Sequence, residues 1–274
     1  MDLHELLIAL LAGALQGVLE WLPVSSQGNL SLFLTAVGTS PEIAIQLSLF
    51  LQVGTTLSAA IYYREDIAEA LGDAPGWRPR TAFERPNAEL SFVVLATAVT
   101  GVVGIPLYAT LLDAASELAG GAFVALIGIL LVLTGLLQQT SESVGLGNRD
   151  LPDWIDAVLV GALQGLAVLP GVSRSGTTAS GLLVRGHDGP SAFRLSFLMS
   201  IPAGLGAAAL TMADAGGLPG VSAGSAAVSL VVSVVVGYAA IDALLRIVER
   251  VPFWAVCYGL GGLAIVGGAL VTVA

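Results

Sequence analysis

The chain has 274 residues, of which 55% are hydrophobic and 11% are charged, and its mean hydropathy is +0.88. A soluble domain carries about a quarter of its residues charged, so most of this surface must face lipid, and the apolar content also excludes disorder. The net charge of −10 excludes a nucleic-acid partner, and the single cysteine excludes a disulfide scaffold. The remaining class is an all-α integral membrane protein.

The predicted membrane spans are runs of about 20 apolar residues, the length that an α-helix needs to cross a bilayer. Six runs qualify: 43–63, 88–112, 118–138, 191–213, 222–245 and 251–273. Two further apolar regions are interrupted by the polar residues 23–29 and 170–178. The arms beside each break are too short to span, and non-helical backbone at membrane depth needs a protein or water cover. We therefore expect two re-entrant helical hairpins, at 6–38 and 155–186.

The two hairpins are copies of each other. Residues 13–17 and 161–165 both read Gly-Ala-Leu-Gln-Gly, an offset of 148 residues. The same offset, without a gap, aligns Val24-Ser25 and Gly28 with Val172-Ser173 and Gly176. The sequence therefore predicts an internal duplication within one membrane domain, with repeats at 1–138 and 139–274.

The positions of the basic residues predict the orientation. Counting spans from the first hairpin places four segments on one face of the membrane, at 64–87, 139–154, 185–190 with the start of the next span, and 246–250. These segments contain every arginine except Arg174, namely Arg64, Arg78, Arg80, Arg85, Arg149, Arg185, Arg194, Arg246 and Arg250. The positive-inside rule makes this face cytoplasmic. Both termini and the first hairpin are then outside, the second hairpin enters from the cytoplasm, and the halves form an inverted repeat with a site near the midplane.

All ten basic residues are arginines, while Asp and Glu number 20. Such an acidic, lysine-free composition suggests a halophilic source.

Polar groups at membrane depth indicate where that site lies. Glu20 and Arg174 are ionisable there, and such residues are functional by default; the alternative is a structural ion pair between the halves. The stretch 173–178 combines hydroxyls, a guanidinium and a helix start, which together bind phosphate. We expect a ligand with a phosphate head and a lipid tail. The residues expected to bind it are Gln16, Ser25, Gln27, Gly28, Ser173, Ser175, Gly176, Thr177 and Thr178.

Two blocks of this sequence resemble the signatures of the BacA-type undecaprenyl-diphosphatases. Residues 16–28 read QGVLEWLPVSSQG, and residues 170–176 read PGVSRSG. Ile45-Gln46 and the stretch 193–198, followed by Pro202, are also similar to that family. The resemblance implies a membrane phosphatase that removes the terminal phosphate of a polyprenyl diphosphate at an outward-facing site, with a divalent cation, Mg²⁺ or Ca²⁺.

The resemblance also implies roles for single residues. Gln16 and Glu20 fit the first family motif, Ser26 matches the proposed nucleophile, and Arg174 matches the essential arginine. Asn29 stands where the family usually has a histidine, and an amide cannot take a proton. Either Glu20 takes the proton as the base, or catalysis is slow or absent. We also expect Glu20 to be the cation ligand and Asn29 to orient a phosphoryl oxygen.

Other functions remain open at this stage. An inverted repeat with broken helices is typical of transporters, so the main alternative is a polyprenyl-phosphate carrier that does not hydrolyse its ligand. An ion transporter and a structural bundle are further alternatives. A homodimer is possible.

Overall fold

The computed structural model describes residues 2–117, 120–143, 149–248 and 251–273, and it contains no strand within these ranges. The all-α prediction is therefore confirmed. In chain order the α-helices are α1 Leu3–Leu19, α2 Ser26–Ala36, α3 Pro41–Tyr62, α4 Arg64–Asp73, α5 Ala88–Glu117, α6 Gly120–Ser143, α7 Trp154–Leu166, α8 Arg174–Val184, α9 Gly189–Asp214, α10 Ala223–Val248 and α11 Phe253–Val273.

The six longest helices confirm the predicted spans. In the described part of the chain, α3, α5, α6, α9, α10 and α11 are long and apolar enough to cross a membrane. Their outer faces carry large apolar side chains, such as Val102 at 76% exposure and Leu263 at 74%. Such surfaces are stable in lipid, and the chain is a multi-pass membrane protein.

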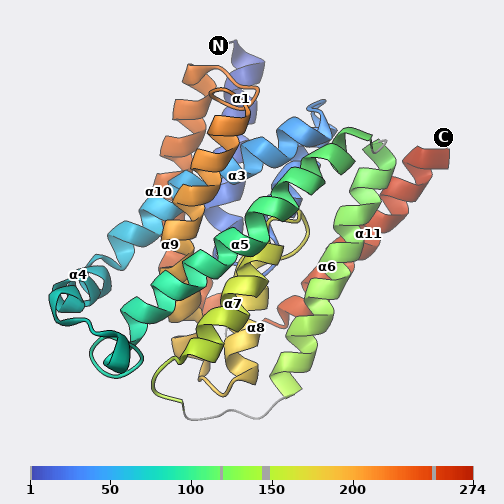
Figure 1. Cartoon of the computed structure of the whole chain (residues 1–274). Helices are drawn as coiled ribbons and strands as arrows, with labels where there is room; N and C mark the ends of the chain where they lie inside the picture. Colours follow the sequence, from blue (N-terminus) through green and yellow to red (C-terminus); the bar gives the residue numbers. More distant parts are fainter. Residues whose placement is uncertain (1, 118–119, 144–148, 249–250, 274) are drawn as a thin grey trace.

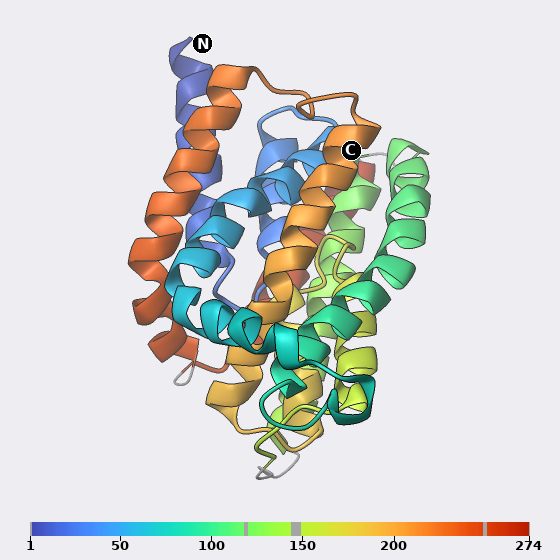
Figure 2. The ribbon, with the colours of Figure 1, turned by 60° about the vertical axis from the view of Figure 1, so that its left-hand side comes forward.

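The two polar breaks each separate a pair of shorter helices. α1 ends at Leu19 and α2 starts at Ser26, while α7 ends at Leu166 and α8 starts at Arg174. Side-chain caps explain the restarts, because Ser25 and Ser173 accept hydrogen bonds from the N–H groups of Gly28 and Gly176 at 3.2 and 3.1 Å. In Figures 1 and 2, the N-terminus and the start of α1 lie at the upper end of the bundle, whereas α7 and α8 lie in its lower half.

Small residues decide which helices pack together. α1 packs on α10, α7 on α5, α3 on α9 and α6 on α11. A Cβ at Gly17 of α1 would lie 2.9 Å from the backbone nitrogen of Gly237, and one at Gly161 of α7 would lie 2.6 Å from the carbonyl oxygen of Ala96. Glycines of this kind let helix backbones touch in a membrane. The duplicated pentapeptide therefore supplies both short helices with a packing face.

We predict that Gly161→Ala destabilises the protein by about 1–3 kcal/mol, because the added methyl must push α7 away from α5. The control is Gly259→Ala in α11, where a Cβ would meet nothing within 4 Å and where alanine favours the helix. Unfolding of the purified protein in detergent measures both variants. Equal stability of the two would contradict the close α5–α7 packing.

Candidate active site

The two polar breaks meet in the middle of the bundle. Ser25 Oγ accepts a hydrogen bond from the Gly171 N–H at 3.1 Å and donates to the Val172 carbonyl at 3.3 Å. Gly28 touches the same loop, since a Cβ there would lie 2.6 Å from the Gly171 nitrogen. Ser25 has φ 58°, a left-handed conformation that is strained for serine and clusters at functional sites.

A buried ion pair joins the two halves beside this contact. Glu20 Oε1 pairs with Arg174 Nη2, and the side chains are 7% and 16% exposed. Glu20 Oε2 accepts hydrogen bonds from Ser26 Oγ at 2.6 Å and from Gln16 Nε2 at 2.9 Å. A hydroxyl that is hydrogen-bonded to a carboxylate can serve as a nucleophile with an adjacent base. The ion pair between the two halves, which was the structural alternative to a functional site, is therefore present. Its neighbours are also groups that could take part in a reaction.

Arg174 is oriented by two further neighbours. Its Cζ lies 5.7 Å from the centroid of the Phe197 ring, which places the guanidinium at cation–π distance. Its Nη1 donates to the Ser196 carbonyl at 3.5 Å. These contacts hold the guanidinium next to Glu20 at the start of α8, where helix N–H groups also favour an anion.

The predicted residues fall into two groups. Seven of them line one small cavity of about 10 Å³: Glu20, Ser25, Ser26, Gln27, Ser173, Arg174 and Ser175. The others support its walls: Gln16, Gly28, Asn29, Gly176, Thr177 and Thr178. For example, Thr178 Oγ1 is hydrogen-bonded to Ser196 Oγ at 2.6 Å, and Thr177 Oγ1 donates to the Ser173 carbonyl at 2.8 Å.

Asn29 faces the backbone of its own turn. Its Nδ2 donates to the carbonyls of Val24 and Ser25 at 2.7 and 2.9 Å. The amide therefore stabilises the turn that carries Ser25 and Ser26, and Asn29 is not among the residues that line the two cavities described here.

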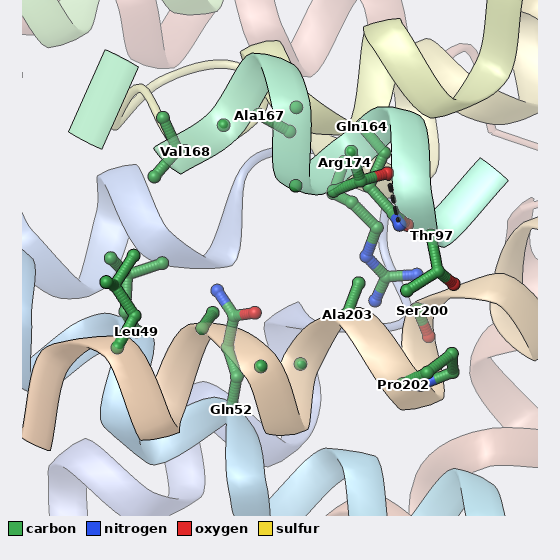
Figure 3. Close-up of a pocket in the computed structure, with 18 of the residues that line it drawn as sticks. Leu49, Gln52, Thr97, Gln164, Ala167, Val168, Arg174, Ser200, Pro202 and Ala203 are labelled. Atoms are coloured by element: carbon green, nitrogen blue, oxygen red, sulfur yellow. Dashed lines mark hydrogen bonds between the residues drawn. The ribbon is translucent and has the colours of Figure 1, made fainter. Parts of the chain in front are cut away.

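A second, larger cavity of about 200 Å³ lies between α3, α5, α7 and α9 (Figure 3). Its walls are mostly apolar or glycine, for example Leu49, Ile105 and Leu210. It shares Gln52, Ala167 and Arg174 with the small cavity. Sequence reasoning missed Gln52, whose only signal is a polar side chain in an apolar span.

The residues present fit a divalent cation that is also held by a ligand phosphate. Among the described residues, no group of three or more His, Cys, Asp or Glu can hold a metal alone. However, Gln27 Oε1 is buried with no hydrogen-bond partner in the described chain, and Gln27 lines the small cavity with Glu20. Carboxylate and amide oxygens are ligands for Mg²⁺ and Ca²⁺.

Comparison with known proteins places the chain in a family. The model of the bacitracin resistance protein BacA matches residues 9–266. The chain belongs to the BacA family. It is 54% identical over 270 residues to an undecaprenyl-diphosphatase of Haloarcula marismortui, covering 98% of this chain and 99% of the relative. Relatives of the same name in Methanococcoides burtonii and Methanopyrus kandleri are each 38% identical, covering 94% and 95% of this chain and 96% and 95% of theirs. The Haloarcula relative fits the halophilic composition.

We predict that Arg174→Lys weakens binding of a polyprenyl phosphate about tenfold, which corresponds to about 1.4 kcal/mol. Lysine keeps the charge but loses the planar fork that binds two phosphate oxygens. The control is Arg64→Lys, since Arg64 is an exposed residue that pairs with Glu65. Titration of the purified proteins in detergent measures the dissociation constants. Equal affinity in the two variants would remove Arg174 from the binding site.

Proposed function

We propose that this protein is a membrane phosphatase that hydrolyses a polyprenyl diphosphate of the undecaprenyl type to polyprenyl phosphate and inorganic phosphate. The observation that carries the proposal is the hydrogen bond from Ser26 Oγ to Glu20 Oε2, next to the Arg174 guanidinium. It combines a nucleophile, a base and an anion-binding group in one buried place. The names of the BacA-family relatives support the same reaction.

The two adjoining cavities suit the two parts of such a substrate. The small cavity is polar and the larger one apolar, so the diphosphate binds in the first and the start of the lipid tail in the second. Ile105 lines the larger cavity and is 55% exposed. The cavity thus reaches the lipid-facing side of α5, where the rest of the tail continues into the bilayer.

The ion pair between Glu20 and Arg174 must open before the diphosphate can bind, because the small cavity of about 10 Å³ has room for about one water molecule. The terminal phosphate then binds the Arg174 guanidinium in place of the Glu20 carboxylate. Glu20 is left without its positively charged partner and can accept a proton. Ser26 Oγ then attacks the terminal phosphorus while its proton moves to Glu20, and the bond from phosphorus to the bridging oxygen breaks. Polyprenyl phosphate leaves, and water releases inorganic phosphate from the serine. Alternatively, Ser26 orients a water for direct attack.

A divalent cation, Mg²⁺ or Ca²⁺, would be held by Glu20 and the Gln27 amide oxygen together with the substrate. When bound, it would neutralise part of the diphosphate charge, which is the main requirement of phosphoryl transfer. Asn29 was predicted to orient a phosphoryl oxygen; in this proposal it acts on the phosphoryl group only indirectly, through the turn that its amide stabilises.

The halves at 1–138 and 139–274 form an inverted repeat in this proposal, with re-entrant hairpins at 6–38 and 155–186. Two contacts made by α9 support it, one with α3 and one with α4. Gln46 Nε2 donates to Asp214 Oδ2 at 2.8 Å, and Arg194 Nε donates to Asp66 Oδ1 at 2.7 Å. Gln46 and Arg194 are 148 residues apart, and so are Asp66 and Asp214. The first contact joins α3 to α9, and the second joins α9 to α4, the helix that follows α3, so the two contacts are equivalent with the halves exchanged.

The arrangement of the arginines supports an active site and chain termini that lie outside the cytoplasm. One of these arginines, Arg250, lies outside the described residues.

We predict that cysteines at Ser40 and Ala215 label from outside the cell, and a cysteine at Gly76 only after permeabilisation. These three positions are exposed. The native Cys257 is buried, so the parent protein serves as the unlabelled control. Labelling of all three from one side contradicts the inverted repeat. A homodimer stays a prediction.

We predict that Glu20→Gln abolishes phosphate release, because the amide keeps the size and hydrogen bonding but accepts no proton. Asn29→His keeps or raises the rate, since it adds a group that titrates near neutral pH. Phosphate release from a polyprenyl diphosphate by purified protein, in high salt with Mg²⁺ or Ca²⁺, measures both against the parent. A parent that binds polyprenyl phosphate but never hydrolyses the diphosphate would establish the carrier alternative instead.

A further inference from the structure

Gln52 of α3 stands at the passage between the two cavities. Together with Ala167 and Arg174 it borders both of them. Figure 3 shows the Gln52 and Arg174 side chains pointing into the same space from different elements. The Gln52 side chain makes no hydrogen bond with any described residue. The Gln52 side chain is partly buried, so its amide is available to a ligand that enters the passage.

The other polar groups in the larger cavity have already used their donors. Thr97, Thr100 and Ser200 donate to carbonyls of their own helices at 2.6–2.7 Å. Gln164 Nε2 donates to Thr100 Oγ1 at 3.2 Å, while its buried Oε1 has no partner within the described residues. That end of the cavity therefore presents oxygen acceptors, which disfavour an anion. Among the residues that both cavities share, the side-chain N–H donors left for an anion are those of Gln52 and Arg174.

We propose that Gln52 binds the phosphate that stays on the lipid. This inference rests on the proposed function. With the terminal phosphate beside Ser26 and the tail in the larger cavity, the lipid-linked phosphate lies between them, at the residues that both cavities share. Ala167 has no side-chain donor and Arg174 also serves the terminal phosphate, so Gln52 is the group left for this position. It donates to the oxygens that gain charge as the bond to the terminal phosphorus breaks, and it also holds the product.

The test is the affinity of the full chain in detergent for farnesyl phosphate, a short polyprenyl monophosphate. Gln52→Leu should raise its dissociation constant about tenfold, as expected for a lost hydrogen bond to a charged group. Gln52→Glu, which preserves the size of the side chain, should raise it further through repulsion. The dissociation constant of inorganic phosphate, which binds at Ser26 and Arg174, should stay within about twofold in both variants.

The matched control is Gln139→Leu, the same substitution at an exposed α6 residue that accepts a hydrogen bond from Tyr258. It should leave both affinities unchanged. Unchanged binding of farnesyl phosphate by Gln52→Glu overturns the inference, and so does an equal loss of both ligands, which indicates a collapsed site. The titration needs no turnover. A parent that fails to hydrolyse a polyprenyl diphosphate of the undecaprenyl type therefore removes the phosphatase proposal, while the role of Gln52 is still measured.

Discussion

The ion pair between Glu20 and Arg174 is the interaction on which the rest of the site depends. It links residues 154 positions apart, one from each half of the chain. Each charge would be costly in this interior alone, and losing one partner of a buried pair costs about 3–5 kcal/mol. The pair therefore holds the tips of both broken helices together. The Arg174 guanidinium can also bind phosphate, and the Glu20 carboxylate can also accept a proton. A ligand that uses either group must first replace the ion pair between them.

The two halves share the residues that cap their short helices and differ at the position that follows. Ser25 and Ser173 occupy equivalent positions, and both cap the helix that follows. The functional difference appears one residue later, where Ser26 of the first half is equivalent to Arg174 of the second. The Ser26 hydroxyl and the Arg174 guanidinium both bond to the carboxylate of Glu20, which brings the two equivalent positions close together. Divergence at a single repeated position thus places a hydroxyl near a guanidinium.

The position of the site within the bundle also determines what it can bind. A polar cavity bordered by an apolar one suits an amphiphile whose head enters the protein while its tail remains near lipid. Packing at the glycines of α1 and α7 brings these short helices close enough to their neighbours to enclose the polar ends. Water is then largely excluded, and electrostatic interactions with a diphosphate are stronger than they would be in solvent.

The sequence by itself determined the local features: the six spans, the two polar breaks, the duplication and the motifs of the family. These follow from hydrophobic runs, helix caps and repeated residues, all of which act within a few turns of chain. Only the tertiary structure decided that Glu20 meets Arg174, that Asn29 bonds to its own turn, and that Gln52 borders both cavities. Such pairings depend on the rotation and depth of helices far apart in sequence. Many rotations bury a helix equally well, and close packing selects one of them.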